Sequence, residues 1–109
     1  AHPMNIRIRA SLGDTLLRSG DVGEAIEVLE AGIAIAERTL GKDHPETADI
    51  RYNIGGAYAM ARRNDDALAA YLEVERVWRA TFAPDHADLG ALDNNIATML
   101  RRQGKVDEA

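Results

Sequence analysis

The sequence predicts an all-α fold made of stacked helical hairpins, and three of its features support this prediction. First, aromatic residues make up only 5% of the 109 residues while alanine is abundant, and small side chains suit closely packed helices better than sheets. Second, apolar residues recur at helical spacing in blocks that turn residues separate. Third, the whole pattern repeats along the chain, which is typical of repeat architectures.

The repeat has a period of 42 residues, which the histidines His2, His44 and His86 mark. Alignment at this spacing needs no gap and divides the chain into the units 2–43, 44–85 and 86–109, of which the last is truncated. Residues 1–109 are therefore predicted to form a single array of about two and a half repeats. The matching positions are Ile8 with Ile50, Gly13 with Gly55, Ala25 with Ala67 and Ala109, and Thr39 with Thr81.

Each unit is predicted to be a pair of helices joined by a turn. In the first unit the segment 19–21 interrupts the apolar pattern, and Asp21 followed by Glu24 forms a capping pair that begins the second helix. The two apolar stripes that flank this turn consist of Ile8, Leu12, Leu16 and Leu17, and of Ala25, Ile26, Leu29, Ile33 and Ala36.

The junction between units ends one helix and begins the next. Gly41 supplies a left-handed C-cap, and Pro45 keeps the residue before it out of the helical conformation. The second unit ends equivalently at 82–86. We therefore expect helices near residues 4–19, 22–39, 46–62, 64–81 and 88–103.

The units resemble tetratricopeptide repeats, in the longer form of about 42 residues that is known from kinesin light chains and many bacterial signalling proteins. The resemblance covers the whole chain and implies a right-handed α-solenoid of antiparallel helix hairpins. Small residues of the pattern let the two helices of a hairpin approach closely, while bulky ones fill the gap to the next hairpin. The residues that carry the resemblance are a large apolar residue of the first helix (Leu12, Ile54 and Ile96), the small residue after it (Gly13, Gly55 and Ala97), a bulky residue three positions later (Leu16, Tyr58 and Leu100) and an alanine of the second helix (Ala25, Ala67 and Ala109).

Three positions depart from that pattern. Arg62 stands where the glycine between the helices belongs, and Asn64 replaces an apolar residue and is interpreted as an N-cap. Gly32 replaces an alanine, which is expected to loosen the first unit by up to about 1 kcal/mol.

Composition excludes several classes of function. The formal net charge of −5 disfavours binding to nucleic acid, and there is no apolar run near the roughly 20 residues that span a bilayer. The absence of cysteine excludes thiol chemistry and fits a cytoplasmic setting. Arginine outnumbers lysine, which points weakly to a bacterial source. We expect no catalytic residues, no cofactor and no membrane contact.

Three groups of residues have a chemical and a structural interpretation. The histidines lie too far apart in stacked hairpins to share a metal ion, so they are expected to cap helices. The carboxylate pairs Asp65-Asp66 and Asp107-Glu108 fall at helix starts, where they complement the helix dipole. Tyr71 and Trp78 fall on an apolar stripe, which favours core packing over binding.

The resemblance implies that the first helix of each unit lines a concave groove that holds a protein or peptide. In this groove four arginines face two aspartates, while the outer helices carry glutamates, so we hypothesise an acidic or C-terminal carboxylate-bearing ligand; a merely solvated groove is the alternative. The groove residues are Arg7, Ala10, Ser11, Asp14, Leu17 and Arg18, then Asp49, Tyr52, Asn53, Gly56 and Met60, then Ala91, Asn94, Asn95, Thr98, Arg101 and Arg102.

The sequence thus predicts a protein–protein interaction module, a piece of a larger bacterial protein. The competing interpretation is an architectural or oligomerisation element of a multidomain signalling protein that has no peptide ligand. Because a polar capping element is not evident at the C-terminal end, the last full helix is expected to be half covered and self-association through that end is a further expectation. Its apolar residues are Leu89, Leu92, Ile96, Met99 and Leu100.

Overall fold

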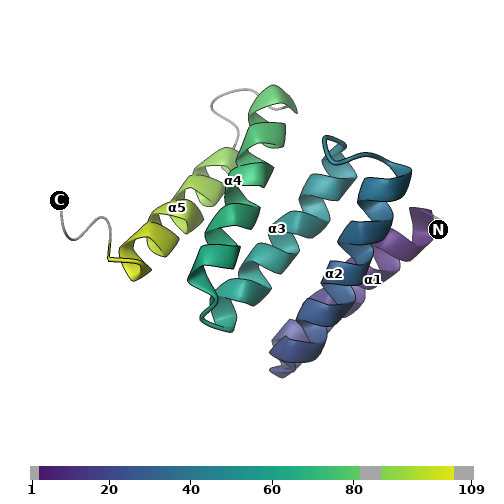
Figure 1. The fold of residues 1–109 in the computed structure, drawn as a ribbon, viewed down its shortest axis with the longest axis horizontal. Helices are drawn as coiled ribbons and strands as arrows, with labels where there is room; N and C mark the ends of the chain where they lie inside the picture. Colours follow the sequence, from purple (N-terminus) through teal and green to yellow (C-terminus); the bar gives the residue numbers. More distant parts are fainter. Residues whose placement is uncertain (1–2, 82–86, 105–109) are drawn as a thin grey trace.

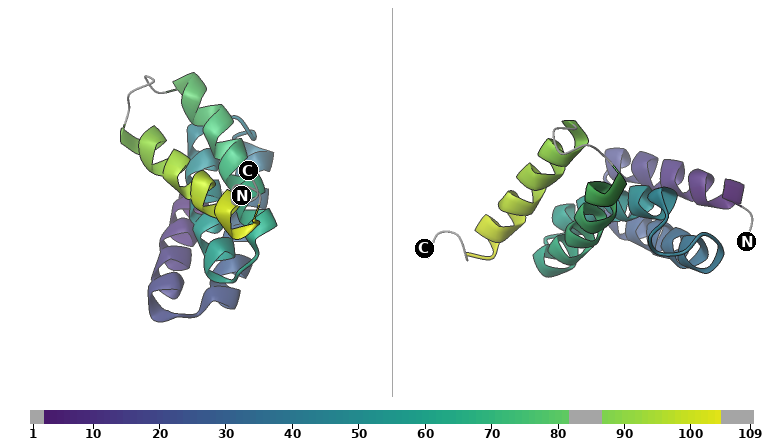
Figure 2. Two further views of the ribbon diagram at one scale, coloured as in Figure 1. Left: turned by 90° about the vertical axis from the view of Figure 1, so that its left-hand side faces the viewer. Right: turned by 90° about the horizontal axis from the view of Figure 1, so that it is seen from above.

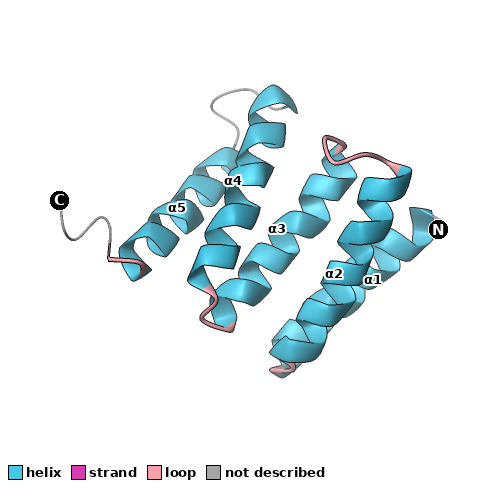
Figure 3. Ribbon diagram, in the orientation of Figure 1, coloured by secondary structure: helices cyan, strands magenta, loops and turns pink. Residues whose placement is uncertain are grey.

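The computed structural model describes the backbone of residues 3–81 and 87–104 and the side chains from Ile8 onward within these ranges. The described chain is entirely helical, as expected, with short loops between the helices (Figures 1 and 3). Its helices are α1 (Pro3–Ser19), α2 (Val22–Thr39), α3 (Pro45–Met60), α4 (Asn64–Thr81) and α5 (Ala87–Arg102). None of these helices is long and apolar enough to cross a membrane.

The helices stack as hairpins in chain order. α1 pairs with α2 and α3 pairs with α4, while α2 also packs against α3 and α4 against α5. Seen from above, α1, α3 and α5 lie on one side of the stack and α2 and α4 lie on the other (Figure 2). This arrangement is that of the predicted α-solenoid, with one set of helices forming an inner wall.

Glycines inside α1 and α3 let each hairpin close tightly. A Cβ atom added at Gly13 would lie 2.5 Å from the Leu29 side chain, and one added at Gly55 would lie 2.6 Å from the Tyr71 ring. Across the hairpin, Ala25 and Ala67 are fully buried. The predicted role of the small residues in close helix approach is therefore confirmed at these positions.

Gly32 has a packing role that adds to the sequence interpretation. A Cβ atom at this position would collide with Cδ1 of the buried Ile50 and would lie 3.3 Å from Cβ of Arg9. The glycine thus allows close contact between α2 and α3, a packing role that the sequence interpretation did not include. Its helix-propensity cost is offset by packing that an alanine would disturb.

The turns within the hairpins share one conformation despite the arginine in the second. Gly20, Arg62 and Gly104 occupy equivalent positions and have φ angles of 89°, 65° and 79°. α3 therefore ends at Met60 rather than at residue 62. The interpretation of Asn64 as an N-cap was also wrong, because α4 begins at this residue and its buried Oδ1 accepts no hydrogen bond.

The junction between the first two units behaves largely as expected. Gly41 has φ 92° and its N–H donates to the Ala36 carbonyl at 3.1 Å, and Nδ1 of His44 accepts the N–H of Glu46 at 3.0 Å. His44 therefore caps α3, as predicted, whereas His2 and His86 lie outside the described residues. Asp21 does occupy the N-cap position of α2, but its side chain makes no capping hydrogen bond, so the predicted capping pair is not formed.

Two connected cores hold the stack together. One joins α2 to α3 and includes Leu29 and Ile54, and the other joins α3 and α4 to α5. Tyr71 and Trp78 belong to the second core, with 4% and 6% of their surface exposed, which confirms their predicted packing role.

The last helix is better covered than the sequence predicted. Leu89, Leu92 and Met99 are at most 3% exposed, because α4 covers the face on which they lie, whereas Ile96 and Leu100 are half-buried. The expectation that all five were half covered was wrong for three of them. The large exposed apolar side chains lie on other helices: Ile8 and Leu12 of α1 are 55% and 46% exposed, Met60 of α3 is 54% exposed and Leu72 of α4 is 47% exposed.

Candidate peptide-binding groove

The predicted groove residues lie on α1, α3 and α5, the three helices of the inner wall. Arg7 is outside the residues whose side chains are described. The remaining polar residues fall into two groups, one near the N-terminal ends of α3 and α5 and one near the C-terminal ends of α1 and α5. Because alternate helices of a hairpin stack run in the same direction, these two groups occupy opposite sides of the groove.

The first group surrounds a cleft of about 280 Å³ between α3 and α5. Aromatic rings form one wall, since the Tyr52 ring centroid lies 5.3 Å from that of Trp78 and 5.7 Å from that of Tyr71. The cleft is lined by Asp49, Tyr52, Asn53, Trp78, Asp88 and Ala91.

Asn95 connects the two helices that border the cleft. Its side-chain amide donates a hydrogen bond of 3.0 Å to the hydroxyl of Tyr52, which joins α5 to α3. This contact fixes the orientation of the Tyr52 ring and uses the amide internally. Asn95 therefore positions Tyr52, and its predicted contact with a ligand stays a prediction.

The cleft is electrostatically negative. Partial burial raises the pKa of Asp49 above its ordinary value, and the carboxylates of Glu46 and Asp88 raise it further. Within the described residues the Asp49 carboxylate has no ion-pair or hydrogen-bond partner. An anionic ligand group would be repelled at this side of the groove, whereas a cationic or neutral polar group would be accepted.

The second group is basic, and its side chains make exposed internal contacts. Arg18 pairs with Asp14 at 2.8 Å, with 79% and 50% of the two side chains exposed. On α5, Arg101 donates to the Thr98 hydroxyl at 3.2 Å, and Arg102 donates to a backbone carbonyl at the end of α3 at 3.1 Å. Such exposed contacts contribute little to stability, so these arginines can exchange them for a ligand at small cost.

The other predicted groove residues differ in exposure. Met60 is 54% exposed at the C-terminal end of α3, and Asn94 is exposed on α5. Asn53 is half-buried in the cleft. The structure therefore brings Asp49, Tyr52 and Asn53 together in one cleft and places Met60 apart from them.

Sequence reasoning missed two residues of the cleft. Asp88 lies one helical turn before Ala91 on α5, so helical periodicity alone could have included it. Trp78 belongs to α4, a second helix of its unit, and reaches the groove between α3 and α5. No sequence pattern indicates that the Trp78 side chain lines this cleft, because its position there depends on where α5 packs.

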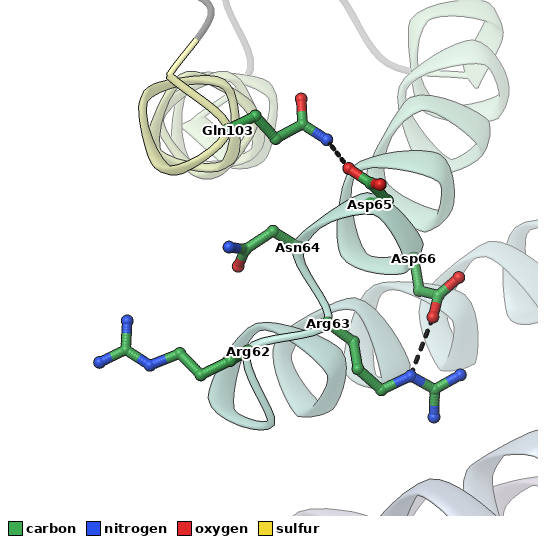
Figure 4. Close-up of a pocket in the computed structure, with 6 residues that line it drawn as sticks. All are labelled: Arg62, Arg63, Asn64, Asp65, Asp66 and Gln103. Carbon is green, nitrogen blue, oxygen red and sulfur yellow. Dashed lines mark hydrogen bonds and ion pairs between the residues drawn. The ribbon is translucent and has the colours of Figure 1, made fainter.

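A larger cavity of about 600 Å³ lies outside the groove, between the turn that joins α3 to α4 and the end of α5 (Figure 4). The side chain of Gln103 donates to Asp65 across it, and Arg63 donates to Asp66 at 2.8 Å beside it. Its walls are mostly polar and it borders the strained turn at Arg62. Among the described residues no group of three histidine or carboxylate side chains is placed to hold a metal ion, here or in the groove.

Comparisons with known proteins agree with this geometry. The sequence pattern of the tetratricopeptide repeat matches residues 6–80. The chain is 27% identical over 95 residues to the Arabidopsis thaliana protein kinesin light chain-related 3, and 26% identical over 81 residues to the human clustered mitochondria protein homolog. These matches cover 87% and 74% of the chain but only 15% and 6% of the two relatives.

A solved structure has nearly the same fold. It contains nearly identical TPR-like repeats of a Podosopora anserina protein described as a kinesin light chain, and it superposes with a TM-score of 0.91 at 25% identity. The match covers 98% of the present chain and 51% of that one. The relatives named here are eukaryotic, and the bacterial source stays a prediction.

Proposed function

The chain belongs to the tetratricopeptide repeat family, and on this premise we propose that it binds an extended segment of a partner protein in its groove. Repeats of this family are generally protein–protein interaction modules and non-catalytic scaffolds. The observation that carries the proposal is the cleft between α3 and α5. There Tyr52 offers aromatic surface, packed against the largely buried Trp78 ring 5.3 Å away, while Asn53 offers an amide that can pair with a peptide backbone. Since the sequence has no cysteine, the proposal places the module in the cytoplasm.

The charges on the two sides of the groove orient the ligand. Carboxylate side chains or the C-terminal carboxylate of the partner would lie beside Arg18, Arg101 and Arg102, whose guanidinium groups can form forked hydrogen bonds. The negative cleft around Asp49 would receive a neutral or cationic part of the same segment. The hypothesis of an acidic ligand is thereby restricted to one side of the groove.

Charge reversal on the basic side tests this proposal. The variant with Arg18→Glu, Arg101→Glu and Arg102→Glu is expected to bind a fluorescein-labelled pool of acidic peptides with free C-termini at least about tenfold more weakly than the parent chain. Fluorescence anisotropy at low and high salt measures the effect. The control variant carries Arg38→Glu and Lys42→Glu on the exposed outer surface and should bind as the parent chain does. Unchanged affinity in the groove variant would refute the acidic-ligand proposal.

The exposed apolar stripe on α1 favours a second candidate function, that of an architectural or oligomerisation element. Ile8 and Leu12 are about half exposed, whereas their equivalents one repeat later, Ile50 and Ile54, are 1% and 2% exposed beneath α2. A helix of another molecule could cover Ile8 and Leu12 in the same way. Light scattering separates the two candidate functions. A molar mass of the parent chain that rises with protein concentration, together with a monomeric mass of the Leu12→Glu variant, supports association through this face.

A further inference from the structure

A second cleft lies on the face opposite the groove, between α2 and α4. It has a volume of about 390 Å³ and is called the α2–α4 cleft below. Its base reaches the core, because Ile54 and Ala70 line it and are only 2% and 9% exposed. Ile33 from α2 and Ala69 from α4 extend this apolar base on either side. The volume is at the low end of the roughly 300–1,000 Å³ of ligand pockets, so a few side chains can enter but a whole helix cannot.

Arg51 of α3 lines the same cleft and is unusually buried for a charged residue. Only 10% of its side chain is exposed, and its Nη2 donates to the Glu37 carboxylate. The other terminal nitrogen, Nη1, is buried without a hydrogen-bond acceptor. A buried donor of an ionised group that lacks a partner costs free energy, and an acceptor brought by a ligand would remove that cost.

The rim of the cleft is acidic. Asp66 and Glu73 pair with Arg63 and Arg76, whereas the Glu30 carboxylate accepts the Tyr58 hydroxyl at 2.7 Å and has no ion-pair partner among the described residues. Glu37 already neutralises the single buried guanidinium. The cleft therefore keeps an excess of negative charge, which favours a cationic ligand group and disfavours an anionic one.

We propose that the α2–α4 cleft binds a short segment of a partner protein in which a lysine or arginine stands next to an aliphatic residue. The aliphatic side chain packs on Ile54 and Ala70, and the cationic side chain pairs with Glu30 at the rim. A backbone carbonyl of the segment accepts the free N–H groups of Arg51. This surface is separate from the groove between α1, α3 and α5, so the chain can hold two partners, or two segments of one partner, on opposite faces.

Amide NMR spectra of the full chain titrated with the capped tripeptide acetyl-Arg-Leu-Arg-amide test the proposal. Saturable shifts are expected at the amides of Ile33, Ala69 and Ala70, weakening with salt, and acetyl-Glu-Leu-Glu-amide should leave these amides unchanged. Shifts confined to Tyr52 and Asn53, equal shifts with both peptides, or no shift up to roughly 10 mM peptide would each overturn it.

Variants of the chain locate the binding more sharply. Ala69→Phe fills the cleft from an exposed position and should abolish the shifts. The matched control is Ala80→Phe, which is also exposed and lies about three turns further along the same face of α4, and it should bind normally. Arg51→Lys keeps the charge opposite Glu37 but removes the second nitrogen, so affinity should fall roughly two- to tenfold. If Ala69→Phe and Ala80→Phe bind equally well, the proposal is wrong.

Discussion

Ile8 and Ile50 allow a comparison within one chain, because the repeat places the same side chain in an exposed and in a buried environment. Both occupy the same position of a first helix, 42 residues apart. Ile50 is 1% exposed and fills the space that Gly32 leaves open between α2 and α3. Ile8 is 55% exposed, since none of the described helices covers its face of α1. Mutation of each to alanine should therefore have very different consequences.

The structure sets the size of the difference. Ile50→Ala removes buried carbon atoms from a closed interface and leaves a cavity, so it should destabilise the chain by about 2–5 kcal/mol. A loss of about 3 kcal/mol corresponds to a melting temperature lower by roughly 12–24 °C for a domain of this size. Ile8→Ala removes a half-exposed side chain and leaves no cavity, so its cost should stay below about 1 kcal/mol.

Urea unfolding followed by circular dichroism measures both variants under identical conditions. A third comparison checks the stated cause, because Gly32→Ala should collide with Cδ1 of Ile50 and destabilise by about 1–3 kcal/mol. Ile50→Val removes that carbon atom, so combining it with Gly32→Ala should cost less than the sum of the single changes. Equal losses for Ile8→Ala and Ile50→Ala, or strict additivity in the double variant, would refute the packing argument.

Two further predictions concern the turn and the cleft. Arg62→Gly should stabilise the chain by about 1 kcal/mol in urea unfolding, because φ of 65° strains an arginine but not a glycine; a destabilised variant would show that the arginine makes a compensating contact. Asp49→Asn should raise the melting temperature at pH 7, because the folded state raises the pKa of this acid and so disfavours its charged form. The gain should shrink as pH falls through the raised pKa and vanish below the ordinary value of 3.8, at which the wild-type carboxyl is neutral in both states; a gain that persists below that value would contradict the assigned cause.

The repeat period explains why the fold could be predicted from the sequence. Residues that coincide after 42 positions, such as Gly13 with Gly55, must serve the same contact if the units stack alike. Helix boundaries followed from local signals, since Gly41 and Pro45 act on their own backbone and need no tertiary context. The groove helices were predictable for the same reason.

The detailed state of individual side chains was not predictable in this way. Arg62 adopts the turn conformation of a glycine, with its N–H bonded to the Ala59 carbonyl, and Asn64 lies inside α4 rather than at its cap. At Gly32 the deciding contact is with Ile50, which belongs to the next unit. The packing role of Gly32 depends on an atom from another unit, so the pattern within its own unit does not show it.

By itself the sequence determined the period, the hairpins and the helices that line the groove, because local backbone preferences and apolar spacing are properties of neighbouring residues. Only the tertiary structure decided which charges and rings share a site. It brought Trp78 of α4 beside Asp49 of α3, and it enclosed Arg51 between α2 and α4 without an acceptor for Nη1. Such sites combine residues from different helices, and their burial and electrostatics depend on distances that the order of residues does not contain.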